Sequence, residues 1–165
     1  MTVFIELDDV FLHTYLCDEN FGYIANPNSK DPEHEFLIAE NQQPVLVYER
    51  DHMREFLEYL KKNKPDIEPV IFTTGQPIYS ERLLNIVDPD RRIFEHAFFR
   101  NACYLFEHHD EDITVFVKDI TRFKTRDVKR SVLIDSKHLS FMMSPENGLP
   151  AIPYNAEYDG QKEFG

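Results

Sequence analysis

The chain has 165 residues, enough for one domain with a substantial core, and 42% of them are hydrophobic. Its formal net charge of -12 argues against nucleic acid and anionic lipid as partners, and it favours basic ligands because unlike charges attract. No run approaches the roughly 20 apolar residues that cross a bilayer, so we expect no membrane span in this chain. The N-terminus shows no targeting segment either.

The first half of the chain predicts strands separated by one long loop and one helix. In order, we expect a strand at 2–7, a short extended piece at 10–16, a loop or flap at 18–44, a strand at 44–48 and a helix at 51–64. The helix follows from the helical spacing of Met53, Leu57 and Leu60, with Asp51 as its N-cap and Pro65 just past its end. The stretch at 18–44 is polar, contains three prolines and shows no sustained period.

The second half alternates apolar strands with one more helix. We expect a strand at 68–73, a helix at 78–87, short strands at 93–99, 104–106 and 115–117, a strand at 128–135, a further strand at 139–143 and an extended tail at 147–153. The short strands between 93 and 117 would form a small β insertion. Apolar strands that alternate with helices indicate a parallel sheet covered on both faces, so the chain predicts a single α/β domain over 1–165.

Polar side chains follow the predicted parallel strands where each strand ends. They are Glu6 and Asp8, then Thr73, then Asp135, and in such sheets ligands bind beyond the carboxyl ends of the strands. Carboxylates such as Glu6, Asp8 and Asp135 are ligands that Mg²⁺ prefers. Thr73 and Lys118 would bind phosphate oxygens. This set suits a haloacid-dehalogenase-type phosphatase, in which one carboxylate attacks phosphorus and a second manages a proton.

Four motifs, in the same order, resemble the phosphatases of the RNA polymerase II C-terminal domain, the FCP/SCP homology family. They are ELDDVF at 6–11, FTTG at 72–75, VKDITRF at 117–123 and LIDSK at 133–137. Arg50 and the FFRNACY segment at 98–104 are similar to two further segments of that family. The resemblance implies a haloacid-dehalogenase-like α/β domain with a central parallel sheet, in which active members use Mg²⁺ and hydrolyse phosphoproteins.

Three positions depart from the pattern of that family. Glu6 stands where the family has its nucleophilic aspartate, Val10 replaces a threonine, and Ser136 replaces an asparagine that binds the metal. Glutamate is one methylene longer than aspartate, and a displacement of about 1 Å at a reacting centre costs on the order of 100-fold in rate. We therefore expect a pseudophosphatase with no cofactor, or with weakly bound Mg²⁺ only. Lys118 would then neutralise the clustered carboxylates, because like charges are costly when partly buried.

The tail resembles a different branch of the same family. SPENGLPAIPYNAEYDG at 144–160 is similar to a segment of the receptor subunit of the mitochondrial presequence translocase, the subunit-fifty family, and IDSKHLSF at 134–141 fits the same pattern. Members of that branch often lack the nucleophile and bind proteins instead of catalysing a reaction. The resemblance implies a place at the mitochondrial inner membrane or in the intermembrane space. The partners it implies are basic presequence peptides and other translocase subunits.

A receptor for a basic amphipathic helix needs apolar anchors for one face of the helix and carboxylates around the rim. Aromatic and acidic residues of the insertion and the tail are our candidates for such a surface: Tyr104, Phe106, Glu107, Tyr154, Glu157, Tyr158 and Asp159. Two alternatives stay open. One is a Mg²⁺-dependent phosphoprotein phosphatase in which Glu6 is an impaired nucleophile and Asp8 the acid/base. The other is a structural subunit of a large mitochondrial complex built on the same fold.

Overall fold

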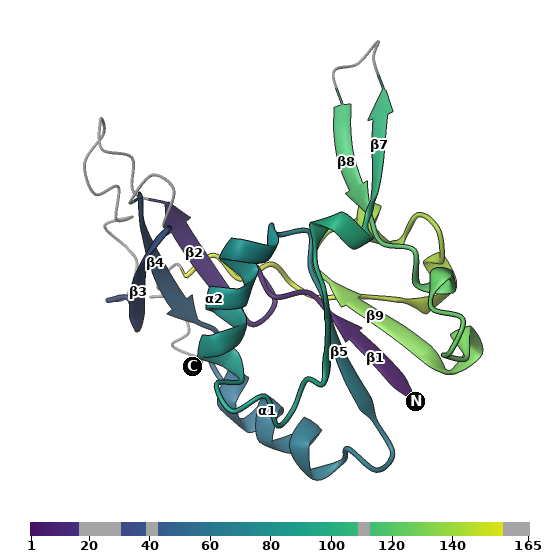
Figure 1. Cartoon of the computed structure of the whole chain (residues 1–165), viewed down its shortest axis with the longest axis horizontal. Helices are drawn as coiled ribbons and strands as arrows, with labels where there is room; N and C mark the ends of the chain where they lie inside the picture. The colour runs from purple at the N-terminus through teal and green to yellow at the C-terminus, as the bar shows by residue number, and fades with distance from the viewer. Residues whose placement is uncertain (17–30, 39–42, 109–112, 157–165) are drawn as a thin grey trace, which may run out of the picture.

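The computed structural model describes residues 1–16, 31–38, 43–108 and 113–156, which form three β-sheets and two α-helices (Figure 1). The central sheet contains β1 (Thr2–Ile5), β5 (Glu68–Phe72), β6 (His96–Phe98), β9 (Ser131–Asp135) and β10 (Gly148–Pro150). A second sheet contains β2 (Leu12–Leu16), β3 (His34–Ile38) and β4 (Gln43–Glu49), and a hairpin contains β7 (Tyr104–His108) and β8 (Ile113–Val117). The α-helices are α1 (Met53–Lys62) and α2 (Pro77–Val87).

The central sheet has the strand order β10-β9-β1-β5-β6, and all of its pairings are parallel. This confirms the predicted α/β fold with a central parallel sheet. Strand β1 lies between β5 and β9, with Phe4 opposite both Val70 and Leu133. Because these three strands run in the same direction, their carboxyl ends meet at one edge, where the polar residues predicted from the sequence follow them.

Successive side chains of β1 point to opposite faces of the sheet and so belong to two separate cores. Val3 and Ile5 pack in the cluster that also contains the apolar faces of α1 and α2, and Figure 1 shows both helices on the same side of the sheet. Phe4 points the other way and packs with Phe72 and Phe123. That second face is covered by short 3₁₀ helices and turns, since its chain segments are too short for a full helix.

The β2-β4-β3 sheet occupies part of the stretch that was predicted as a loop. Strand β3 pairs antiparallel with β4 from His34 opposite Val47 to Ile38 opposite Gln43, so the prediction of a loop over 18–44 is wrong at 34–38. Phe36 and Ile38 are partly buried and pack against the core, whereas Leu37 between them is exposed. This alternation over a few residues is the mark of a half-buried strand, and the prolines of the segment concealed it.

Three smaller predictions also need correction. Strand β6 joins the central sheet, so the insertion begins after it and consists of the β7–β8 hairpin, which stands out from the body of the molecule (Figure 1). Residues 138–141 form a 3₁₀ helix where a strand at 139–143 was predicted, because Phe141 turns inward to pack on the sheet. Helix α1 begins one residue later than expected, with His52 and not Asp51 at the cap position.

Neither helix in the described part of the chain is long and apolar enough to cross a membrane.

Candidate functional site

The first candidate residue, Glu6, is buried directly after β1, and both oxygens of its carboxylate accept hydrogen bonds. One carboxylate oxygen, Oε1, accepts a hydrogen bond from the backbone N–H of Leu7 at 2.8 Å. The other, Oε2, accepts from the backbone N–H of Thr74 at 3.1 Å and from the Lys118 ammonium at 2.6 Å. Both oxygens of the side chain at the nucleophile position are therefore held by donors of the protein itself.

Lys118 follows β8 and joins Glu6 to Asp135, which ends β9. Its Nζ lies 2.5 Å from Oδ2 of Asp135, and the side chains of Glu6, Lys118 and Asp135 are 2%, 0% and 0% exposed. Burial alone would lower the pKa of Lys118, but the two carboxylates more than reverse this, so the pKa lies above its ordinary value and the ammonium stays charged. The ammonium thus lies beside Asp135, as expected. We call these three residues the buried triad.

Thr73 lies at the end of β5 beside the buried triad, but its hydroxyl is used inside a turn. Thr73 Oγ1 accepts from the backbone N–H of Gly75 at 3.0 Å, and the residue is fully buried. At Gly75 an added Cβ would lie 2.2 Å from Ser80 Oγ, so a larger residue would displace the Ser80 side chain of helix α2. The turn carries the backbone N–H of Thr74 to Glu6, which is how β5 contributes to the site.

Asp8 lies near the buried triad but binds other partners. Its Oδ1 accepts a hydrogen bond from the Tyr79 hydroxyl of α2 at 2.6 Å, and the Thr14 hydroxyl of β2 lies 2.6 Å from the same Tyr79 oxygen. Burial, followed by the charge of Glu6, raises the pKa of Asp8 to about 6. Tyr79 and Thr14 were not identified from the sequence, because Tyr79 reads as part of an amphipathic helix and Thr14 as part of an ordinary strand.

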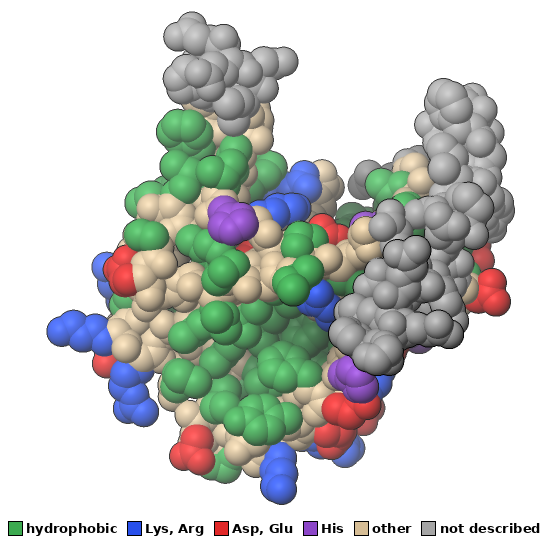
Figure 2. Space-filling view, turned by 180° about the vertical axis from the view of Figure 1, so that it is seen from behind, with side chains coloured by type: hydrophobic (Ala, Val, Ile, Leu, Met, Phe, Trp, Pro, Cys, Tyr) green, Lys and Arg blue, Asp and Glu red, His purple; other side chains and the backbone are tan. Residues whose placement is uncertain are grey.

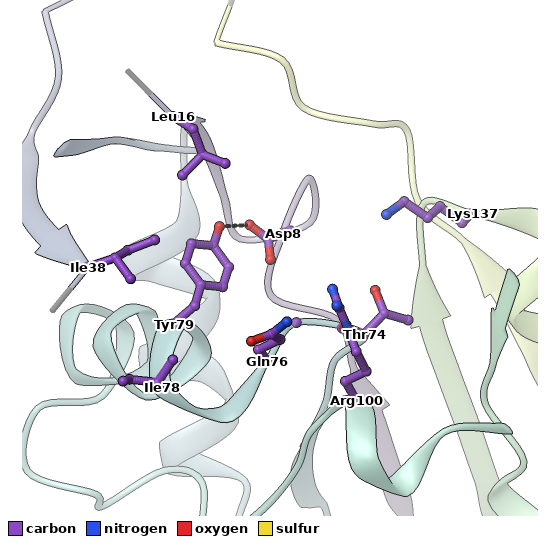
Figure 3. A pocket seen from close by; sticks show the side chains of 10 residues that line it. Asp8, Leu16, Ile38, Thr74, Gln76, Ile78, Tyr79, Arg100 and Lys137 are labelled. Carbon is purple, nitrogen blue, oxygen red and sulfur yellow. Dashed lines mark hydrogen bonds between the residues drawn. The ribbon is translucent and has the colours of Figure 1, made fainter. Parts of the chain in front are cut away.

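A pocket of about 400 Å³ opens above Asp8, and its two sides differ in chemistry (Figure 3). Its apolar lining comes from the second sheet and α2: Leu16, Ile38, Ile78 and the ring of Tyr79. On the opposite side lie Arg100, from the turn after β6, and Lys137, from the turn after β9. Neither cationic residue was named as a candidate from the sequence, although Arg100 lies in the FFRNACY segment and Lys137 ends the LIDSK segment.

A divalent cation does not fit the side chains as they are arranged. The cation would have to bind the carboxylates of Glu6 and Asp135, but the Lys118 ammonium already lies between them. Asp135 Oδ1 accepts from the backbone N–H of Lys137 at 2.8 Å, and the next residue is Ser136, which has no amide oxygen to offer. In the part of the chain that the structure describes, no group of three or more His, Cys, Asp or Glu residues is placed to hold a metal ion.

The partner-binding candidates of the insertion lie on the hairpin and are exposed. Tyr104 and Phe106 lie on one face of the hairpin, 49% and 45% exposed, and Glu107 is exposed on the same strand. Leu105 is 52% exposed on the other face. Arg122 lies over the ring of Tyr104, with its Cζ 4.8 Å from the ring centroid, so the base of the hairpin is cationic as well as aromatic.

The candidates of the tail are not brought together with those of the hairpin. Tyr154 donates its hydroxyl hydrogen to the backbone carbonyl of Glu49 at 2.9 Å, and its ring packs with the cluster that contains Tyr48 at the second sheet. Figure 1 shows the hairpin and the second sheet at different ends of the molecule. Glu157, Tyr158 and Asp159 lie outside the described residues.

Strands β1, β5 and β9 thus end at a buried carboxylate–ammonium–carboxylate group, with a third acid, Asp8, near it. The sequence matches the family of NLI interacting factor-like phosphatases over residues 1–164. The chain belongs to this family. Its solved relatives agree with the fold: the fission yeast RNA polymerase II CTD phosphatase Fcp1, bound to beryllium fluoride, superposes with a TM-score of 0.66 at 17% identity, over 93% of this chain and 41% of that one.

Curated relatives of this family member include phosphatase-like proteins and translocase subunits. CTD small phosphatase-like protein 2 of Dictyostelium discoideum is 28% identical over 134 residues, 81% of this chain and 22% of the relative. The mitochondrial import inner membrane translocase subunit TIM50 of Debaryomyces hansenii is 29% identical over 159 residues, 96% of this chain and 27% of the relative. The chain therefore spans less than a third of the length of either relative.

Proposed function

We propose that this chain is a catalytically silent, phosphatase-like domain that acts as a protein-binding subunit. The observation that carries the proposal is the engagement of Glu6. The Glu6 side chain is 2% exposed, three of the roughly four lone-pair sites of its carboxylate already accept hydrogen bonds, and one oxygen pairs with Lys118. Little of the carboxylate is therefore open to attack a substrate. Freeing the carboxylate would leave a charge buried without its partner, which costs several kcal/mol. We therefore infer that the buried triad stabilises the fold, as two buried ion pairs that share Lys118.

Silence is tested by hydrolysis of p-nitrophenyl phosphate with Mg²⁺ present. We expect no turnover above the background rate for the wild type or for Glu6→Gln, a change that keeps the size of the side chain. Glu58→Gln on α1, where the carboxylate is exposed, is the matched control. Turnover that is present in the wild type and in Glu58→Gln but lost in Glu6→Gln would contradict the proposal.

The binding surface that we propose is the β7–β8 hairpin with its surroundings. A two-stranded hairpin is marginal by itself in water, and this one exposes large apolar side chains on both of its faces. Figure 2 shows hydrophobic side chains running from the hairpin across the adjoining face of the molecule. Leu139 is also exposed, and it belongs to the same region because its 3₁₀ helix, at 138–141, contacts β8 and β9. Large exposed apolar patches are typical of protein-interaction sites.

The finer version of the proposal is a receptor in mitochondrial presequence import, placed at the inner membrane or in the intermembrane space. Its support is the similarity of the tail to translocase receptors, the relatives named TIM50 and the net charge of -12. Within the described residues of the hairpin Glu107 is the one carboxylate, and Arg122 covers Tyr104. We therefore expect apolar anchors to set most of the affinity, and the overall charge to set the encounter rate.

Titration with a basic presequence peptide at low and high salt tests this version. We expect binding that weakens as salt rises, and a loss of about 1–2 kcal/mol in Phe106→Ala. Tyr59→Ala, which removes an exposed aromatic side chain on α1, should bind as the wild type does. If the peptide does not bind at low salt, the chain is not a presequence receptor. The structural-subunit alternative then takes its place, and the chain should co-purify with a larger assembly.

One observation favours the phosphatase alternative. Asp8 lies on the wall of an open pocket with a pKa of about 6, close to the value that suits proton exchange near neutral pH. In that alternative Asp8 would be the acid/base and Mg²⁺ the cofactor. The hydrolysis assay with Glu6→Gln separates the two functions directly.

A further inference from the structure

The pocket above Asp8 is two-sided, and its polar side carries two cations, Arg100 and Lys137, that form no salt bridge with any carboxylate of the described residues. Arg100 Nε donates to the backbone carbonyl of Thr74 at 2.6 Å, and its Cζ lies 4.8 Å from the centroid of the Phe116 ring. These contacts fix the plane of the guanidinium, and no carboxylate of the described residues pairs with it. Lys137 lies on the same side of the pocket, and its ammonium points toward Asp8 (Figure 3).

Arg100 and Lys137 are thus positioned as donors for a group that the described part of the chain does not itself supply. A guanidinium held in a fixed plane loses little side-chain freedom when it binds an anion, which makes it a good receptor for a planar acceptor pair. The Lys137 ammonium adds a mobile point charge to the same space. An anion is the ligand chemistry that this side of the pocket fits.

The opposite side of the pocket fits a hydrocarbon. Ile78 on α2 is 46% exposed, and Ile38 and the ring of Tyr79 stand beside it on the same wall (Figure 3). The cavity of about 400 Å³ lies within the range of small-molecule sites, which combine a mostly apolar lining with a few polar groups. The ligand should therefore carry its anionic group on an apolar body.

The charges around the pocket limit how much negative charge the ligand brings. Three carboxylates lie in or just beneath it, at Asp8 and in the buried triad, and three cations accompany them, at Lys118, Arg100 and Lys137. These six charges sum to zero. A bound monoanion would make the net charge of the pocket -1, and a phosphate dianion would make it -2, in both cases directly next to Asp8. Because like charges at short range are costly in a partly buried site, a carboxylate fits better than a phosphate.

We propose that this pocket binds a monocarboxylate carried on an apolar body, with the carboxylate between Arg100 and Lys137 and the body against Ile38 and Ile78. A medium-chain fatty acid and the C-terminus of an apolar peptide carry the same chemistry. The pocket borders the hairpin, because Arg100 lies over Phe116 of β8, but no described residue of the hairpin lines it. Binding there requires neither phosphatase activity nor a presequence.

Calorimetric titration with octanoate, below the concentration at which it forms micelles, tests the proposal on the full chain. We expect saturable binding about tenfold tighter than that of octanol, since a charge-assisted hydrogen bond to a cation distinguishes the two. Octylamine should not bind. Lys137→Met should weaken octanoate binding about tenfold and leave octanol binding unchanged, and Ile78→Ser should weaken both. An N-acetylated dipeptide ending in leucine, compared with its C-terminal amide, shows which source of the carboxylate binds more tightly.

Lys129→Met removes an exposed lysine outside the pocket and serves as the matched control. Equal loss in Lys137→Met and Lys129→Met would mean that only the overall charge matters, and it would overturn the site. Equal affinity for octanoate and octanol, or no binding of either carboxylate, would overturn it as well. Tighter binding of octyl phosphate than of octanoate would reject the carboxylate class and identify the pocket as a phosphate site.

Discussion

The Tyr79 hydroxyl donates to Asp8 Oδ1 across 2.6 Å and so ties helix α2 to the segment that follows β1. The same Tyr79 oxygen lies 2.6 Å from the Thr14 hydroxyl, which adds the second sheet to the contact. Burial and the charge of Asp8 raise the pKa of Tyr79, so the phenol stays protonated and remains a donor at all physiological pH values. One side chain thus holds three chain segments at the mouth of the pocket.

Tyr79→Phe should lower the free energy of unfolding by about 1–2 kcal/mol, because it removes both hydrogen bonds of the hydroxyl and leaves Thr14 and Asp8 with only the long bond of 3.5 Å between them. It should also raise the pKa of Asp8 further, since the Tyr79 hydrogen bond lowers that pKa. Urea denaturation and NMR titration of the Asp8 carboxyl measure the two effects. An unchanged pKa of Asp8 would show that the hydrogen bond does not act on its charged form.

Asp8→Asn should make stability less dependent on pH. The folded-state pKa of Asp8 is about 6 against an ordinary value of 3.8, so the folded chain binds this proton more tightly than the unfolded one. The stability contributed by Asp8 therefore falls as pH rises from about 4 to about 6, and the cost persists above that. At pH 7.5 we expect Asp8→Asn to be more stable than the wild type by on the order of 1–2 kcal/mol, with no gain at pH 4. Thermal unfolding across this range checks it; parallel curves for the two chains would contradict it.

Lys118→Met should destabilise the fold by about 3–5 kcal/mol at pH 7, because Glu6 and Asp135 are then buried without a counter-charge. Adding Glu6→Gln to Lys118→Met should recover part of the loss, as should lowering the pH, since both remove one of the unpaired charges.

Urea denaturation of the single and double variants measures this coupling, with Lys129→Met as the surface control. If Lys118→Met lowers the free energy of unfolding no more than Lys129→Met does, the buried triad contributes no more to stability than an exposed charge.

Gly75→Ala should lower stability by about 1–3 kcal/mol, because its Cβ would lie 2.2 Å from Ser80 Oγ. Ser80→Ala removes that oxygen, which is buried and has no hydrogen-bond partner in the described part of the chain. The double variant should therefore be more stable than Gly75→Ala alone, and denaturation of the three variants tests the contact. If Ser80→Ala brings no recovery, the strain lies against Thr73 and Tyr79 instead, which are 3.3 Å from the same position.

The sequence by itself determined the parallel sheet and the edge at which Glu6, Thr73 and Asp135 meet. Apolar runs at 2–5, 68–72 and 131–135 form buried parallel strands, and parallel strands end at one edge whatever lies between them. The strands of the hairpin were also predicted, because its residues pair with near neighbours along the chain. Features of this kind depend on the local sequence and can be predicted without knowing how distant segments pack.

Tertiary structure alone decided which partner each charge takes. Lys118 binds Glu6 from 112 positions away and Tyr79 binds Asp8 from 71, and no spacing in the sequence encodes the direction in which such side chains turn. The strand at 34–38 became recognisable only once β4 paired with it. Tyr154 was expected beside the hairpin aromatics, but the tail carries it to the second sheet. Such contacts depend on how separate segments pack, and packing is a property of the folded chain.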